Sequence, residues 1–170
     1  MVVLKSLFFT ILGLLVVPGI VPWLLLYWSG GGLGLTLSIW LLGLLPLLLG
    51  LGLFFWCQAA FTFKGRGTLA PVAAPILLVR SGPYTFMRNP MYLALFLMIG
   101  GEALLFHSWW LLVYLLLLMI GVHLFVVCIE EPLLSRQFGQ SYQRYLRTVP
   151  RWLPRPSRPS DWNGGELTIL

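Results

Sequence analysis

The chain has 170 residues, of which 59% are hydrophobic and only 9% are charged, so it is far more apolar than an ordinary soluble domain. Its formal net charge of +6 comes from 11 basic and 5 acidic residues. With no basic fold that could bind a duplex, this charge indicates membrane topology and attraction to anionic lipids, and excludes a nucleic-acid partner. The composition predicts an all-α, polytopic membrane protein with a single membrane domain over residues 1–170.

The first two membrane spans are predicted near residues 6–28 and 35–57. Between Ser6 and Phe63 there is no Asp, Glu, Lys or Arg, and a helix needs about 20 apolar residues to cross the hydrocarbon core. The glycine-rich stretch 28–34 supplies the turn between the two spans. A cleaved signal peptide is the alternative for the first span, but the apolar region is longer than such signals have, and no small-residue cleavage site follows.

Two further spans are predicted near residues 91–106 and 109–129, which gives about four in total. Glu102 is the only charged residue between Met91 and Ile129. The turn falls within the stretch 100–108, and the third span is short for a full crossing.

The region after the fourth span predicts a C-terminal amphipathic helix over residues 132–147. Its apolar side chains recur at steps of four, four and three, while arginines and glutamines follow the same rhythm on another face. Pro132 fits the first helical turn, and Gly139 in the middle of the helix lowers its stability slightly. The last residues, 155–170, are rich in Pro, Ser and Gly and predict a mobile tail.

The distribution of basic residues predicts the orientation. With four spans, all 11 lysines and arginines fall on one side, which the positive-inside rule makes cytoplasmic. Both termini and the polar residues discussed next are therefore expected on the cytoplasmic face. No metal site is expected, because His107 and His123 are isolated, and a lone membrane histidine commonly serves packing or an interhelical hydrogen bond.

The least apolar stretch of the membrane region is RSGPYTFMRNPMY, residues 80–92. Asn89 is a strong helix N-cap and Pro90 favours the first helical position, so the third span is expected to begin here. The unpaired N–H groups at a helix start favour binding of an anionic group, and the guanidinium of Arg88 adds further hydrogen-bond donors for it. The chain returns to the same face at Glu130 and Glu131. Two interpretations remain open: an interfacial salt-bridge cluster that serves topology, or a polar pocket that opens sideways into lipid.

The motif GPYTFMRNPMYLALF, followed by EEPLLSRQFGQSYQRYLRTVPRWLP, resembles the isoprenylcysteine carboxyl methyltransferase family and the related phospholipid N-methyltransferases. The resemblance covers residues 80–154, and these families are membrane enzymes that use S-adenosylmethionine. Asn89 stands where the family usually has histidine, and Ala94 where it has glycine. The resemblance implies that the following residues form the cofactor pocket: Tyr84, Arg88, Asn89, Pro90, Tyr92, Glu130 and Glu131.

The resemblance also implies roles for the region after Glu131. Tyr142 and Tyr145 are expected to cover the pocket or meet the acceptor. Arg147 or Arg151 is expected to replace the family's catalytic arginine, and Glu130 and Glu131 are the candidates for a general base. If these carboxylates hold the cofactor, a carboxylate or thiol acceptor of isoprenylcysteine type is favoured over a lipid amine, because a protonated amine must first lose a proton.

Two other functions remain open at this stage. One is an NADPH-dependent membrane reductase of the sterol-reductase type, for which the surplus arginines could bind a 2′-phosphate. The other is a non-enzymatic adaptor whose basic helix binds anionic lipid. The expected partners of the methyltransferase are membrane lipids and a lipophilic substrate, with no metal and no nucleic acid.

Overall fold

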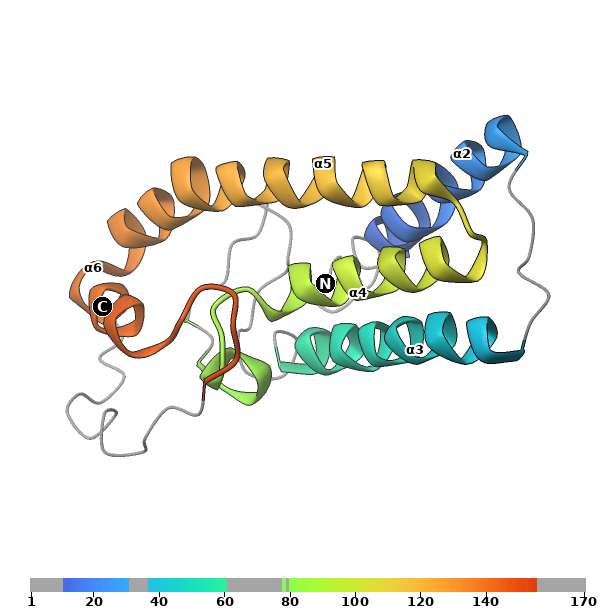
Figure 1. The fold of residues 1–170 in the computed structure, drawn as a ribbon. Coiled ribbons are helices and arrows are strands. Elements are labelled where there is room, and N and C mark those ends of the chain that lie inside the picture. Colours follow the sequence, from blue (N-terminus) through green and yellow to red (C-terminus); the bar gives the residue numbers. More distant parts are fainter. Residues whose placement is uncertain (1–10, 31–36, 61–77, 79, 156–170) are drawn as a thin grey trace.

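The computed structural model describes residues 11–30, 37–60, 78 and 80–155, and within these ranges every regular element is a helix (Figure 1). This confirms the predicted all-α class. The elements in chain order are η1 (Val16–Ile20), α2 (Val21–Ser29), α3 (Leu37–Ala60), η4 (Gly82–Thr85), α4 (Pro90–Leu105), α5 (Trp109–Phe125), η5 (Val126–Glu130) and α6 (Glu131–Thr148).

Three of the described helices are long and apolar enough to cross a membrane: Ile11–Ser29, Leu41–Ala60 and Trp109–Thr148. The helix Pro90–Leu105 is apolar but has only 16 residues. The predicted count of four spans therefore depends on this shorter helix and stays a prediction, as do the cytoplasmic placement of the site and of both termini. Residues 6–10, 35–36 and 156–170 of the predicted spans and tail lie outside the described residues.

Helices α3 and α4 form the tightest contact of the fold, with α4 lying between α3 and α5 (Figure 1). A Cβ atom added to Gly101 would lie 2.7 Å from the carbonyl oxygen of Gly43, and one added to Gly50 would lie 2.6 Å from that of Ala94. These distances leave no space for a side chain. The two antiparallel helices therefore touch backbone to backbone at two levels, about two turns apart.

The first helical segment contacts α5 through a backbone carbonyl that its own helix does not use. In the π turn η1 the N–H of Val21 bonds to the oxygen of Val16, and Pro22 has no N–H to offer. The carbonyl of Val17 is left over, and the hydroxyl of Tyr114 donates to it at 3.2 Å. At its C-terminal end α2 stops with Gly30 in the left-handed conformation (φ 65°), as the glycine-rich turn predicts.

The sequence predicts a separate amphipathic helix over residues 132–147, but the helix runs without interruption from Trp109 into α6. Between α5 and α6 lies the π turn η5, in which the N–H of Glu131 bonds to the oxygen of Val126. The predicted unbroken course of α6 is wrong at Gly139, whose backbone (φ 51°, ψ −127°) is not helical. Glycine permits this conformation at little cost, so the chain bends there rather than continuing straight.

Candidate active site

A compact turn leads the chain into α4 and positions Arg88. Gly82 adopts φ 62° at the start of η4, and the hydroxyl of Thr85 donates to the carbonyl of Gly82 at 2.7 Å. Pro83 and Tyr84 are buried, and burial raises the pKa of the Tyr84 phenol well above its usual value. The turn is thus anchored by its own side chains before the helix begins.

The segment 149–155, which we call the C-terminal strap, runs beside this turn. The N–H of Arg88 donates to the carbonyl of Pro150 at 2.9 Å, and the N–H of Arg155 donates to the carbonyl of Phe86 at 3.0 Å. Arg155, the first residue of the predicted mobile tail, is therefore tied to the fold. These two bonds hold the strap across the start of α4.

Asn89 occupies the N-cap position of α4, as predicted, but its side chain makes no capping hydrogen bond. Its Nδ2 donates instead to the carbonyl of Arg151 in the strap, at 3.3 Å. The prediction that Asn89 caps the helix through its side chain is wrong: a cap would need Oδ1 to accept a helix N–H, and the amide is instead oriented by the bond that Nδ2 donates to the strap. Asn89 is nevertheless buried beside the predicted site residues.

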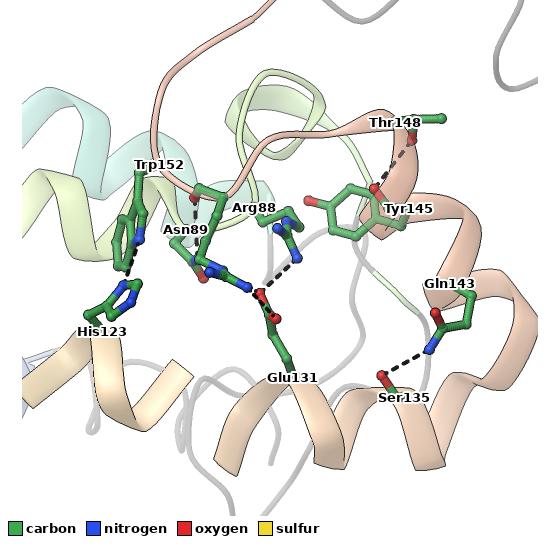
Figure 2. A network of polar contacts seen from close by, with 10 residues as sticks. Arg88, Asn89, His123, Glu131, Ser135, Gln143, Tyr145, Thr148 and Trp152 are labelled. Carbon is green, nitrogen blue, oxygen red and sulfur yellow. Dashed lines mark hydrogen bonds and ion pairs between the residues drawn. The ribbon is translucent and has the colours of Figure 1, made fainter. Parts of the chain in front are cut away.

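Glu131 is the centre of the polar network shown in Figure 2. Arg88 Nη1 lies 2.7 Å from Glu131 Oε1, and the side chains of these two residues are only 12% and 14% exposed. Arg151 approaches from the strap and donates through Nε to Oε1 at 2.8 Å and through Nη2 to Oε2 at 2.9 Å. Such a two-pronged contact is the strong form of an arginine–carboxylate pair, and it raises the pKa of Arg151 above its usual value.

The neighbouring carboxylate, Glu130, has a different environment. Its Oε2 accepts a hydrogen bond from the hydroxyl of Tyr92 at 3.1 Å, and no arginine pairs with it among the described residues. We refer to Arg88, Glu130, Glu131 and Arg151 as the charged cluster. The two adjacent carboxylates therefore differ in their partners. Glu131 is neutralised by two guanidinium groups, whereas Glu130 keeps one oxygen without a partner in the described part of the chain.

The second half of α6, after the bend at Gly139, brings two buried tyrosines over the cluster. Tyr142 interacts with Arg88, and its ring lies 6.1 Å from that of Tyr145, centroid to centroid. The hydroxyl of Tyr145 donates to the carbonyl of Tyr84 at 2.8 Å. Tyr145 therefore supports the turn before α4, whereas Tyr142 lies next to the cluster itself.

The structure thus brings most of the predicted site residues together: Tyr84, Arg88, Asn89, Pro90, Tyr92, Glu130, Glu131, Tyr142, Tyr145 and Arg151. It does not bring Arg147 to them. That side chain is exposed in the last turn of α6 and makes no hydrogen bond or ion pair to the charged cluster. Of the two alternatives, Arg147 and Arg151, it is Arg151 that pairs with Glu131.

Sequence reasoning missed Trp152. Its Nε1 donates to Nδ1 of His123 on α5 at 3.1 Å (Figure 2). His123, expected to serve packing or an interhelical hydrogen bond, therefore accepts its hydrogen bond from the strap. The sequence signal was the pair of prolines, Pro150 and Pro154, which keep the chain around this tryptophan out of a helix.

Two atoms of the cluster suit a zwitterionic amino-acid group. Arg88 Nε is buried and has no hydrogen-bond partner in the described part of the chain, so a donor is available for a carboxylate. Glu130 keeps one oxygen for an ammonium group. Among the described residues no group of three or more His, Cys, Asp or Glu side chains comes together to hold a metal.

A cavity of about 540 Å³ lies elsewhere, along the first helical segment. It is lined by Ile11, Leu14, Leu15, Gly19, Ile20 and Trp23. None of these side chains can transfer a proton or bind an ion. The cavity therefore does not mark a catalytic site, despite its volume. We place the candidate active site at the charged cluster because the groups that can bind a charged ligand are there.

A known protein family matches much of the chain. The family model described as phospholipid methyltransferase matches residues 39–141 of the chain, which is more than half of its length. The match includes Arg88, Glu130 and Glu131 and ends before the C-terminal strap. Among curated proteins, none matches the chain significantly.

Proposed function

This chain belongs to the phospholipid methyltransferase family, and from that premise we propose that it transfers a methyl group from S-adenosylmethionine to a lipophilic acceptor in the membrane. The observation that carries the proposal is the charged cluster, in which Arg88 and Glu131 meet at 2.7 Å beside Glu130. Membership of a methyltransferase family supports methyl transfer over a reductase or an adaptor.

The cluster offers complementary groups for the amino-acid end of the cofactor. We propose that Arg88, through its unused Nε, holds the carboxylate, and that Glu130 holds the ammonium. Glu131 keeps Arg88 in place and is not itself available, because both of its oxygens bind arginines. When bound, S-adenosylmethionine supplies an activated methyl group on its sulfonium.

The remaining residues align the reactants and exclude water. Methyl transfer is a displacement in line with the breaking bond, so a protein accelerates it mainly by positioning and by keeping the site dry. Tyr142 and Tyr145 are buried over the cluster, and the strap covers its other side through Arg151. We propose that Arg151, rather than Arg147, is the arginine that meets the acceptor when the strap adjusts to the bound ligands.

We propose a carboxylate or thiol as the reacting group of the acceptor. An ionised carboxylate needs no base, whereas an ammonium must lose a proton before it can attack. If Glu130 binds the cofactor, the charged cluster has no carboxylate left to take that proton. A lipid amine is the second candidate, and the description of the matched family as phospholipid methyltransferases favours it.

The test is incubation of membranes that contain the protein with methyl-labelled S-adenosylmethionine, followed by extraction of lipids and thiols. A methyl ester releases its label as methanol in mild alkali, while an N-methyl or S-methyl group keeps it. We expect alkali-labile or thioether-bound label. Alkali-stable label that migrates with methylated phosphatidylethanolamine would favour the amine, and no label above that of membranes without the protein would contradict the proposed function.

A further inference from the structure

Trp152 connects two membrane helices at the edge of the charged cluster. Its ring centroid lies 6.0 Å from that of Phe96 on α4 and 6.1 Å from that of His123 on α5. Phe96 is buried, with 8% of its surface exposed. The strap residue is therefore held by an apolar ring and by a hydrogen-bonded imidazole.

His123 lies in an unusual place for a polar side chain. It is exposed on α5, and its neighbours Ile120 and Leu124 are 50% and 55% exposed. On a helix that crosses the bilayer, this surface faces lipid tails, where a polar group without a partner is costly. The indole of Trp152 satisfies only Nδ1, and Nε2 has no partner in the described part of the chain.

The bond from Trp152 determines what Nε2 can do. Since Nδ1 accepts the hydrogen bond from the indole N–H, the single proton of the neutral imidazole is on Nε2. Nε2 is then a hydrogen-bond donor and cannot act as a base while this bond exists. A donor of this kind selects an oxygen: a carboxylate, a phosphate or an ester carbonyl.

The position of the pair connects the lipid-facing surface with the site. Trp152 follows Arg151, which binds Glu131, directly in the chain. On α5, His123 precedes Glu130 by about two turns, so it lies deeper along the same helix. A lipophilic molecule whose polar group reaches the charged cluster would pass along this helix.

We infer that His123, oriented by Trp152, binds an oxygen of the polar group of the lipophilic acceptor and so helps to determine which acceptors are methylated. This inference rests on the proposed function and adds an acceptor-binding residue outside the charged cluster. The shared chemistry is an anionic or ester oxygen, which either the carboxylate of a prenylated cysteine or the phosphate of a phospholipid could supply.

The test compares His123→Leu with His123→Gln. Initial rates are measured in two arms, one with N-acetyl-S-farnesylcysteine and one with phosphatidylethanolamine vesicles. We expect His123→Leu to raise the acceptor KM about tenfold, the effect of about one lost hydrogen bond. His123→Gln should stay within about threefold of the wild type, because the glutamine amide can both accept the indole proton and donate to the acceptor. The affinity for S-adenosylhomocysteine should be unchanged in both variants.

If His123→Leu has the same acceptor KM as the wild type, the inference about His123 is overturned, while the proposed function is not. Equal losses in the Leu and Gln variants, or a parallel loss of S-adenosylhomocysteine affinity, would show a purely structural role and would also overturn it. A wild type that neither binds S-adenosylhomocysteine nor methylates either probe would overturn the proposed function and this inference together. The arm in which the KM effect appears identifies the oxygen source.

Discussion

The contact between α3 and α4 and the charged cluster are held together in opposite ways. In the first, backbones approach so closely that Gly43, Gly50 and Gly101 have no space for a methyl group. In the second, Arg88, Glu131 and Arg151 come from three separate parts of the sequence and meet through charge.

The two regions have different roles: the glycine contact stabilises the fold, and the charged cluster can bind a ligand. The glycine contact contains no group that could bind a ligand, so it serves the fold alone. The charged cluster has one buried polar atom, Arg88 Nε, that has no partner among the described residues and so stabilises nothing by itself. We therefore expect substitutions at the first to remove folded protein and substitutions at the second to leave most helices in place.

The largest effect is expected for Gly101→Val. The new Cβ would lie 2.7 Å from both the oxygen of Gly43 and the nitrogen of Leu47, and backbone atoms cannot move aside cheaply. We expect a loss of about 3 kcal/mol or more, seen as a fall in melting temperature and in yield of monodisperse protein in detergent. The matched control is Gly52→Ala, where nothing lies within 4 Å. Equal melting temperatures for the two variants would refute the close contact.

A smaller effect is expected for Glu131→Gln. Arg88, only 12% exposed, would lose its partner. Breaking a fully buried pair costs about 3 to 5 kcal/mol, and we expect about 2 kcal/mol here because Arg151 is 31% exposed and can turn to water. Glu130→Gln is the control, since it breaks no ion pair within the described part of the chain. Helical circular dichroism should persist in both, and a larger loss for Glu130→Gln in thermal melting would contradict the network as described.

Gly139→Ala tests the bend that carries Tyr142 to the cluster. An alanine at φ 51°, ψ −127° is strained by roughly 1 to 2 kcal/mol. The control is Gly121→Ala in α5, where the backbone is helical and nothing lies within 4 Å, so this change should stabilise slightly. If Gly139→Ala melts at or above the temperature of Gly121→Ala, α6 is not bent in the folded protein.

The smallest of these effects is expected for Asn89→Ala, which removes the 3.3 Å hydrogen bond to the strap carbonyl of Arg151. We expect about 1 kcal/mol of destabilisation and faster proteolysis after the strap. Gln140→Ala, at an exposed position of α6, is the control for the loss of an amide. Identical proteolysis of the two variants would mean that Asn89 does not hold the strap.

The helices could be predicted because hydropathy is a local property of the sequence. The end of α2 at Ser29, the start of the third apolar helix at Pro90 and the start of the next at Trp109 all lie close to their predicted places. The contact of Gly43 with Gly101 could not be predicted, because it depends on which faces of two helices meet. The π turn before Glu131 could not be predicted either, because it changes the backbone hydrogen-bond pattern and no residue type in the sequence marks it.

The site was predictable in its charges but not in its connections. Arg88 and Glu131 were expected near each other because each lies at a helix end on the same side. The failure of side-chain capping by Asn89 could not be predicted from the sequence, because the amide is oriented by a bond from Nδ2 to a carbonyl far along the chain. The choice between Arg147 and Arg151 needed geometry, since α6 ends at Thr148 and only the strap turns back to Glu131.

The most direct test of the account is the affinity of the purified protein for S-adenosylhomocysteine, measured by calorimetry on the wild type, Arg88→Ala and Arg136→Ala. Arg136 is exposed and lies outside the charged cluster, so it controls for loss of one positive charge. We predict that the wild type and Arg136→Ala bind equally and that Arg88→Ala binds at least about tenfold more weakly. Equal binding by all three proteins, or no binding by the wild type, would contradict the assignment of the charged cluster as the cofactor site.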